Sequence, residues 1–284
     1  MDAIKKSKLI SILLIAVIYI LAAVFGTAVY MLLPFAFWVN LLIADAGATV
    51  FVFVFSLIFG NASVYDPYWS VQPIVIIAGY ALTSGFSSAT LLLIISIVIW
   101  GVRLTANWAY AFGGLEYQDW RYTKLDLETG KFYPLINFLG IHMFPTMVVY
   151  CCVLPAVFVT LEGSRANAGS ITGTVICLGA AALQFFADRQ MHKYRNSGQK
   201  GLIRTGLWKY SRHPNYLGEI MMWWGVGIQA VSVLPHYWWL FSGAVINTLM
   251  FFTVSIPMAD KRQSAKPGYA EYKASTRSLL PIPK

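Results

Sequence analysis

The segment between residues 184 and 219 gathers side chains that together could hold an anionic cofactor. Asp188, His192 and Arg195 follow one another at intervals of four and three residues, which places them on one face of a helix. A basic loop with several glycines follows at 198–206. An acid, an imidazole and a guanidinium on one helical face, next to a basic loop, predict a binding site rather than a purely apolar contact.

Further basic residues precede the next helix of this segment. Lys200, Arg204 and Arg212 lie close to Pro214, a residue suited to the first turn of a helix because its missing N–H is no loss there. Helix N-termini attract anions, arginine binds phosphate with two parallel hydrogen bonds, and lysine supplies a point charge. The simpler interpretation, that these cations only hold the membrane topology, leaves the polar residues around them unexplained. These are Asp188, Asn215 and Glu219.

Apolar helices must position these residues. The chain has 284 residues, of which 58% are hydrophobic and 12% charged, about half the charged share of a soluble domain. We predict an all-α polytopic transmembrane bundle of about seven to eight spans, each of roughly 20 residues. The eight apolar runs lie near 9–33, 38–60, 71–84, 87–108, 137–161, 171–190, 216–234 and 237–257.

The basic residues predict the orientation of this bundle. With eight spans, 20 of the 21 Lys and Arg residues fall on one side and only Arg165 on the other, so we expect both termini in the cytoplasm. We treat 1–284 as one integral membrane domain, with substrate-side spans in 1–136 and a cofactor-binding half in 137–284. The first run is too long for a signal-peptide core. We expect a bacterial inner membrane or the endoplasmic reticulum, and neither a metal nor a nucleic-acid partner.

Five stretches carry a family resemblance: DPYWSVQP (66–73), LEYQDWRYTKL (115–125), ADRQMHKYR (187–195), GLWKYSRHPNYLGE (206–219) and KPGYAEYKASTRSLLPIP (266–283). Together they resemble the steroid 5-alpha-reductase C-terminal domain family, and more closely its bacterial and lower-eukaryote branch. Sterol reductases and isoprenylcysteine carboxyl methyltransferases share the RHPxY core. The resemblance implies a helical membrane bundle whose C-terminal spans and loops bind NADPH in a cytoplasm-facing pocket.

The resemblance also implies roles for individual residues. Asp188 and Arg195 match residues that contact the adenosine part of NADPH, the RHPNYLGE string lines the cofactor, and the C-terminal tyrosines and arginine close over it. Arg103 and Arg121 lie on the same predicted side, and we assign them to cofactor phosphate. The expected cofactor contacts are Asp188, His192, Arg195, Lys200, Arg204, Arg212, His213, Asn215, Tyr216, Glu219, Arg103, Arg121, Tyr269, Tyr272 and Arg277.

A reductase of this class transfers a hydride from NADPH to an electron-poor C=C bond of a lipid such as a sterol, a polyprenyl or a fatty enoyl compound. A tyrosine or a protonated carboxyl in an apolar setting suits the acceptor oxygen. We name Asp45, Asp66, Tyr68 and Tyr122 as catalytic candidates. The alternatives are a structural, hydrogen-bonded role for Asp45, an Asx turn at Asp66 before Pro67, and a membrane-interface position for Tyr68.

Two departures from the family pattern bear on specificity. The His and Tyr that many steroid reductases have after the last span are not evident in MADKRQ (258–263), and the Gln and Glu pair of the second span is not obvious. Two other functions stay open. One is an S-adenosylmethionine-dependent methyltransferase of the isoprenylcysteine type, although the Glu pair typical of that class is represented only by Asp260. The other is a lipid-binding membrane protein without catalysis.

Overall fold

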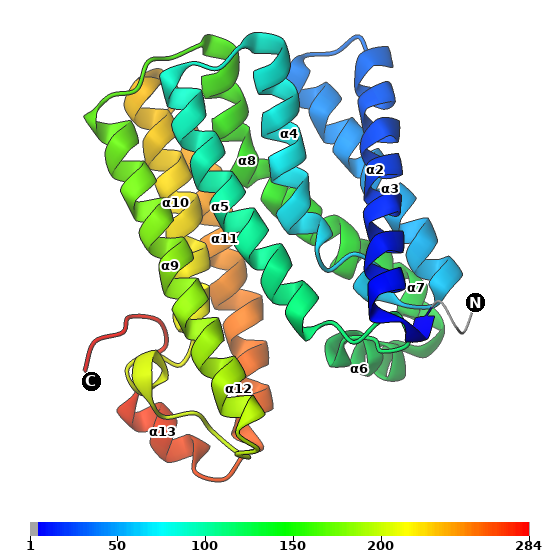
Figure 1. Ribbon diagram of the computed structural model, residues 1–284, viewed down its shortest axis with the longest axis vertical. Coiled ribbons are helices and arrows are strands. Elements are labelled where there is room, and N and C mark those ends of the chain that lie inside the picture. The colour runs from blue at the N-terminus through cyan, green and yellow to red at the C-terminus, as the bar shows by residue number, and fades with distance from the viewer. Residues whose placement is uncertain (1–4, 284) are drawn as a thin grey trace. The chain divides into compact units, whose positions relative to one another are not determined.

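A computed structural model describes residues 5–283, and over that range the chain is helical with no strand (Figure 1). The all-helical prediction is confirmed. Six helical segments are long and apolar enough to cross a membrane, by length and composition. They are α2 (Lys8–Leu32), α3 (Phe37–Phe59), α5 (Ser88–Ala111), the continuous helical stretch Trp120–Glu162, α9 (Ala168–Asn196) and the stretch Pro235–Ser264.

The predicted third and seventh spans are helices that fall outside this set of six. The third is α4 (Tyr68–Ser84), which has 17 residues and contains Pro73. The seventh is α10 (Pro214–Val233), in which Glu219 and Gln229 reduce the apolar character. The chain is therefore compatible with a multi-pass membrane protein, and the count of eight spans stays a prediction.

The chain divides into two compact units, each built from two separate stretches of the sequence. The N-terminal unit comprises the residues up to Gly79 together with Leu104–Tyr150, and the C-terminal unit comprises Tyr80–Arg103 and Cys151–Lys284. The boundaries fall within α4, within α5 and within α8 (Phe144–Glu162).

The N-terminal unit is organised by the contact of α2 with α3. Ser7 caps α2 by accepting a hydrogen bond from the backbone N–H of Ile10, and Gly60 ends α3 in the left-handed conformation, with a φ of 59°. Buried Ile15 and Ile18 of α2 share an apolar core with Val52 of α3. The other elements of this unit are η1 (Ala62–Val64), the start of α4, the end of α5, α6 (Trp120–Thr129), η2 (Gly130–Phe132), α7 (Tyr133–Ile136), the π-helix η3 (Asn137–Met143) and the start of α8.

The C-terminal unit is organised by the close packing of α9 against α10. A capping box between Asn167 and Ser170 begins α9, and Pro214 occupies the first turn of α10 as predicted. Gly173 and Gly225 face the partner helix at a distance that leaves no room for a side chain. The other elements are the end of α4, most of α5 and most of α8, together with η4 (Gly206–Lys209), η5 (Pro235–Phe241), α11 (Ser242–Met250), the π-helix η6 (Phe251–Ser255), α12 (Ile256–Ser264) and α13 (Tyr269–Ser275).

Candidate functional site

The four catalytic candidates form two hydrogen-bonded pairs in the N-terminal unit. In the first pair, the Tyr68 hydroxyl at the start of α4 donates to Asp45 Oδ1 of α3 at 3.1 Å. Gln72, one helical turn after Tyr68, donates through Nε2 to Asp45 Oδ2. All three side chains are buried. Both donors are neutral, and a carboxyl held only by neutral donors in an apolar region is retained at a desolvation cost.

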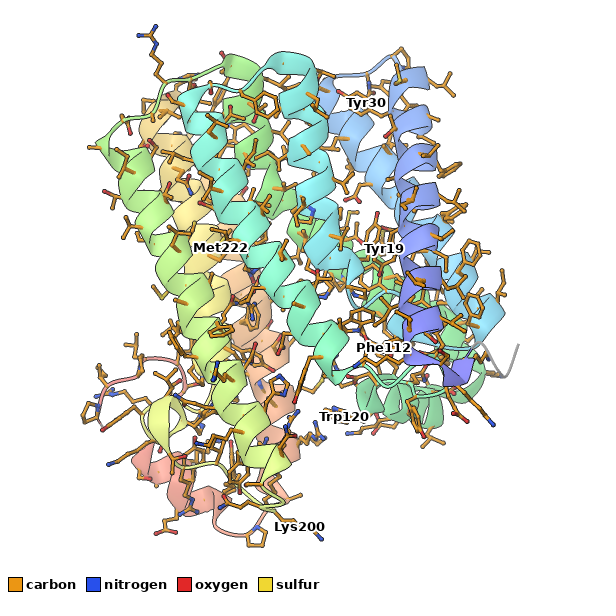
Figure 2. All side chains as sticks on the ribbon, in the orientation of Figure 1. Tyr19, Tyr30, Phe112, Trp120, Lys200 and Met222 are labelled. Carbon is orange, nitrogen blue, oxygen red and sulfur yellow. The ribbon has the colours of Figure 1, made fainter. Side chains whose placement is uncertain are left out.

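Further aromatic rings and hydroxyl groups pack next to the Asp45–Tyr68 pair. The rings of Tyr65 and Tyr68 lie 5.4 Å apart, and the Tyr65 hydroxyl lies 2.8 Å from Thr146 Oγ1 of α8. Tyr19, which Figure 2 labels, lies on α2. Its ring packs edge-on against Tyr68 at 5.4 Å, and its hydroxyl donates to the Val64 carbonyl. The pair is therefore held by buried side chains from four parts of the same unit.

His142 packs among these aromatic and hydroxyl groups, and it was not among the predicted site residues. Its ring lies 4.7 Å from that of Tyr65 and is fully buried. Nδ1 is 3.1 Å from the Asn137 carbonyl oxygen, which can only accept a hydrogen bond, so Nδ1 carries the proton of the neutral ring. Nε2 then presents a lone pair that has no partner among the described residues. An ionisable side chain within an apolar run was the signal that could have identified it.

The second pair joins Asp66 to Tyr122 of α6, whose hydroxyl donates to Asp66 Oδ1 at 2.6 Å. Burial raises the pKa of Asp66 to about 6, although the charge of Arg121 acts in the opposite direction. Arg121 lies in this unit too, where its guanidinium pairs with Asp119 at 2.8 Å and lies over the Tyr122 ring. The charge that we assigned to cofactor phosphate is thus engaged by a carboxylate of the N-terminal unit.

The C-terminal unit contains the rest of the predicted cofactor residues. Asp188, His192 and Arg195 lie on α9 as predicted. Arg103 of α5 forms an ion pair with Asp188 at 2.9 Å, in which the two side chains are only 11% and 17% exposed. The Nε of Arg103 is buried and has no hydrogen-bond partner in the described structure. This ion pair ties α5 to α9.

Glu219 of α10 is enclosed by three neutral N–H donors. Trp100 Nε1 of α5 and Gln184 Nε2 of α9 donate to Oε2 at 2.8 and 2.7 Å, and Trp223 Nε1 donates to Oε1 at 2.9 Å. The carboxylate is 4% exposed. Its hydrogen bonds join three helices, so its position is set by the packing of the unit. The neighbouring Asn215 is half-buried in the first turn of α10 and accepts at its backbone carbonyl from Gln184.

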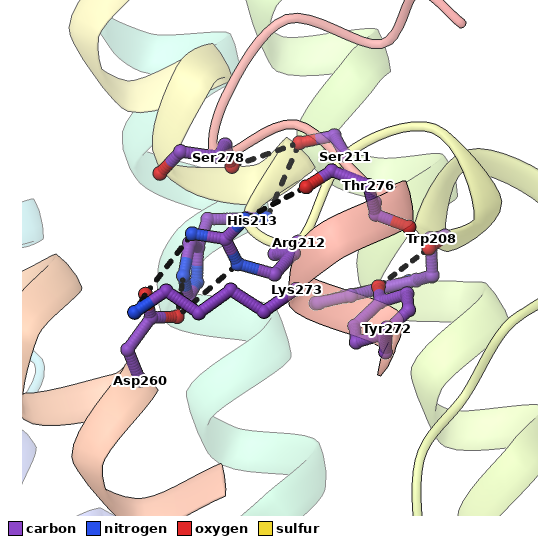
Figure 3. A network of polar contacts seen from close by, with 9 residues as sticks. All are labelled: Trp208, Ser211, Arg212, His213, Asp260, Tyr272, Lys273, Thr276 and Ser278. Atoms are coloured by element: carbon purple, nitrogen blue, oxygen red, sulfur yellow. Dashed lines mark hydrogen bonds and ion pairs between the residues drawn. The ribbon is translucent and has the colours of Figure 1, made fainter. Parts of the chain in front are cut away.

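A polar network surrounds Asp260 of α12 (Figure 3). Its Oδ2 pairs with Arg212 Nη2 at 3.0 Å, and its Oδ1 lies 2.8 Å from His213 Nε2. Burial lowers the pKa of His213, an effect that the Asp260 carboxylate opposes. The Tyr216 ring stacks on His213 with centroids 5.2 Å apart and an interplanar angle of 7°. In the sequence, Asp260 was considered only in relation to a methyltransferase. In the structure it is the acid that contacts the RHPNY string.

The C-terminal segment is fastened to the same string, as Figure 3 shows for several of its residues. Arg212 donates from its backbone N–H to the Arg277 carbonyl at 2.9 Å and from Nη1 to the Thr276 carbonyl at 2.7 Å. Tyr272 donates its hydroxyl hydrogen to the Trp208 carbonyl at 2.5 Å. Arg204 donates to the Gly268 carbonyl at 2.7 Å and pairs with the exposed Glu271. Residues that we grouped from distant parts of the sequence are therefore neighbours here. Tyr269 is buried in α13, Arg277 donates from Nε to the Pro283 carbonyl, and the Lys200 side chain is exposed.

Beside this segment, Lys266 experiences the positive charges of two arginines. Lys266, in the turn between α12 and α13, donates from Nζ to the Gly201 carbonyl at 2.8 Å. Partial burial lowers the pKa of Lys266, and the positive charges of Arg262 and Arg195 lower it further. We call Arg195, Arg262 and Lys266 the basic cluster. Of the three, only Arg195 was among the predicted cofactor contacts, because Arg262 and Lys266 are some 70 residues further along the chain.

Comparison with known proteins gives a family and one distant relative. The family profile described as "Protein of unknown function (DUF1295)" matches residues 52–276. An uncharacterized protein of Schizosaccharomyces pombe is 27% identical over 192 residues, an alignment that covers 57% of this chain and 56% of the relative. The chain thus spans about half the length of this curated relative. No solved structure matches the chain.

Proposed function

The chain belongs to the DUF1295 family, and from that premise we propose that it is a membrane-embedded reductase that transfers a hydride from NADPH to a C=C bond conjugated with a carbonyl group of a lipid. The observation that carries the proposal is the basic cluster of Arg195, Arg262 and Lys266 in the C-terminal unit. Like charges held together repel one another, and a bound phosphate removes that repulsion while accepting charge-assisted hydrogen bonds.

The charge of the cluster favours NADPH over S-adenosylmethionine. NADPH carries a pyrophosphate and a 2′-phosphate, whereas S-adenosylmethionine has a sulfonium cation and no phosphate. Placing a sulfonium among Arg195, Arg262 and Lys266 would bring a positive charge next to three like charges. The cluster thus supports the reductase over the methyltransferase, which shares the RHPxY core.

The residues of the C-terminal unit fit a dinucleotide with phosphates. Arg195, Arg262 and Lys266 would hold phosphate oxygens, and the buried Nε of Arg103 is a donor without a partner in the described structure. The Asp260 network with Arg212 and His213 would keep the C-terminal segment in place around the site. When bound, NADPH supplies the hydride, and the protein's part is binding, orientation and electrostatics.

Protonation of the substrate would fall to the Asp45–Tyr68 pair. Hydride addition to a conjugated C=C bond drives negative charge onto the carbonyl oxygen, and a positioned O–H donor stabilises that charge. The Tyr68 hydroxyl is such a donor, and its single hydrogen is donated to Asp45 Oδ1 at 3.1 Å. To reach the substrate oxygen this hydrogen would have to turn away from Asp45, and a protonated Asp45 would then donate to the Tyr68 oxygen. Gln72 fixes the other carboxylate oxygen, so the orientation of the pair is set before substrate binds. Asp45 is therefore proposed as the group that positions Tyr68.

Ligand-induced stabilisation of the purified full-length protein tests the cofactor assignment. We expect NADPH to raise the Tm more than NADH does, because the 2′-phosphate adds contacts to the basic cluster, and S-adenosylmethionine to have no effect. Lys266→Ala and Arg195→Ala should each weaken NADPH binding about tenfold, as loss of a charge-assisted hydrogen bond does. Lys124→Ala is the matched control, since Lys124 is an exposed cation paired with Glu128 in the N-terminal unit.

Two results would contradict the proposal. Stabilisation by S-adenosylmethionine alone would make the protein a methyltransferase, and stabilisation by anionic lipid with none by any nucleotide would make it a lipid-binding protein. If NADPH binds, Tyr68→Phe should leave its affinity unchanged and lower the turnover of an enone lipid by about 100-fold or more, within the usual contribution of general acid catalysis. Equal turnover in Tyr68→Phe would remove Tyr68 from the chemistry.

A further inference from the structure

We infer that a pocket in the N-terminal unit, separate from the residues proposed for catalysis and cofactor binding, binds a primary ammonium group. The pocket has a volume of about 230 Å³ and is lined by the end of α3, the segment after it, α6, α7 and the π-helix η3. Its polar lining residues are Ser56, Asn61, Gln118, Asp126, Tyr133 and Asn137.

Asn137 presents a buried acceptor to this pocket. The residue is 2% exposed, and its Nδ2 donates to Ser56 Oγ at 3.4 Å. The Ser56 hydroxyl hydrogen is used on the Phe53 carbonyl at 2.8 Å, so its oxygen must accept from Asn137. That requirement sets the orientation of the amide, because the nitrogen has to face Ser56. Asn137 Oδ1 is then left as an acceptor with no partner among the described residues.

The other polar groups of the pocket leave mainly acceptors for a ligand. Asn61 is used on both sides of its amide, by the Leu115 carbonyl and by the Ser63 backbone N–H, both at 2.8 Å. Gln118 Oε1 accepts from the Ala62 backbone N–H. Asp126 contributes an exposed carboxylate, and the buried Tyr133 hydroxyl interacts with Gln118. No lysine or arginine lines the pocket.

These features select the chemistry of the ligand. A water molecule takes up roughly 30 Å³ in the liquid, so the pocket is too large for a single bridging water. A primary ammonium has three N–H donors and a positive charge, which matches the Asn137 oxygen and the Asp126 carboxylate. A quaternary ammonium has the charge without the donors, and an anion is disfavoured by Asp126.

The place of the pocket in the fold suggests two sources of such an amine. The end of α3 and the start of α6 belong to the segments that we predict at the cytoplasmic membrane surface, where ethanolamine headgroups present primary ammonium groups. A free small amine from the cytoplasm has the same chemistry. Separate experimental arms distinguish the two sources.

The test uses the purified full-length protein and reads its Tm. In one arm, ethanolamine is titrated with choline as the control, and in the other arm nanodiscs of phosphatidylcholine are compared with nanodiscs that also contain phosphatidylethanolamine. A saturable rise in Tm with ethanolamine indicates a free amine ligand, and a rise only in the second nanodisc indicates the lipid headgroup. Absence of both effects, or an equal effect of choline, overturns the inference.

Matched variants locate the effect. Asp126→Asn should weaken the amine-dependent stabilisation at least about fivefold, because the charge-assisted part of the contact is lost. Glu128→Gln, an exposed acid on the same helix that does not line the pocket, should leave the stabilisation unchanged. Asn137→Leu should abolish the response, with Asn247→Leu as its control, because Asn247 is another buried asparagine with an unpartnered Oδ1 and belongs to the C-terminal unit. An unchanged response in both pocket variants overturns the assignment.

Discussion

At the scale of single residues, the buried acids of this chain are stabilised in different ways. Glu219 accepts three neutral N–H donors, Asp45 accepts a hydroxyl and an amide, and Asp66 accepts a tyrosine hydroxyl. A carboxylate surrounded by donors keeps its charge inside an apolar bundle, whereas one with fewer donors is a better candidate for proton transfer. The number and kind of donors thus separate a structural acid from a chemical one.

Glu219→Gln should destabilise the protein by about 3 kcal/mol, because the amide nitrogen that replaces one carboxylate oxygen cannot accept a hydrogen bond. Its N–H groups would face the surrounding N–H donors, which would lose an acceptor. The size and shape of the side chain are kept, so the loss reports the charge and the hydrogen bonds of the carboxylate and not a change in packing. Thermal unfolding of the purified variant measures it. Glu271→Gln is the control, since the Glu271 side chain is 80% exposed, and it should change stability little. An unchanged Tm in Glu219→Gln would mean that the three donors do not hold the carboxylate.

The raised pKa of Asp66 predicts a pH dependence of stability. Its pKa is about 6 in the folded protein against an ordinary value of 3.8, so the folded state binds the proton more tightly than the unfolded state does. The corresponding stabilisation is present below pH 4 and is lost as the pH rises from about 4 through about 6, by at most about 3 kcal/mol.

Asp66→Asn should remove this part of the pH dependence. Tm values between pH 4 and pH 7 measure it, with Asp126→Asn, an exposed acid of the same unit, as the control. The assignment to Asp66 is wrong if the Tm of Asp66→Asn falls between pH 4 and pH 6 as steeply as that of the wild type.

At the scale of elements, the contact of α9 with α10 positions most of the predicted cofactor residues. A Cβ at Gly173 would lie 2.6 Å from the Gly225 carbonyl oxygen, and one at Gly225 would lie 2.5 Å from Cys177 Sγ. The backbones therefore approach one another as closely as glycine permits, which is the usual packing of small residues between membrane helices. The same contact brings Gln184 of α9 to Glu219 of α10.

Gly173→Ala should separate α9 from α10 and destabilise the protein by about 1–3 kcal/mol, the usual consequence of overpacking. Gly179→Ala on the same helix is the matched control, because a Cβ there meets nothing within 4 Å. That substitution should leave stability unchanged or increase it by up to about 1 kcal/mol through helix propensity. Thermal unfolding of both variants decides the point, and equal Tm values would contradict the close packing.

At the scale of the whole molecule, charge and span count are linked. Six helical segments meet the length and composition of a span, and α4 and α10 are helices outside that set. Six or eight spans both place the two termini on one side of the membrane, whereas adding only one of these helices places them on opposite sides. With eight spans the Lys and Arg residues lie almost entirely on one side, whereas without α4 and α10 they divide about equally between the two sides, so their distribution favours eight spans.

Reporter fusions test this orientation. A green fluorescent protein fused after residue 284 should fluoresce, and alkaline phosphatase at the same position should be inactive, because we expect the C-terminus in the cytoplasm. A reporter inserted near Arg165, between α8 and α9, should show the opposite pattern. Fluorescence at both positions would show that the predicted span count is wrong.

The sequence by itself determined the helical class, the membrane character and the local placement of motifs. Apolar composition and helical period are properties of short stretches, so the positions of Asp188 and Arg195 on one helix and of Pro214 at a helix start were readable without the fold. The division into two units was not readable, because it depends on which helices contact one another.

Only the tertiary structure decided which distant residues act together. It paired Asp45 with Tyr68 and Asp66 with Tyr122, and it joined Arg195 to Arg262 and Lys266. Residues such as His142 and Asp260 gain their importance from partners on other helices. Hydrogen bonds and charge pairs act over a few ångströms in space, whereas a single sequence records only the order along the chain, so tertiary packing alone assembles the sites.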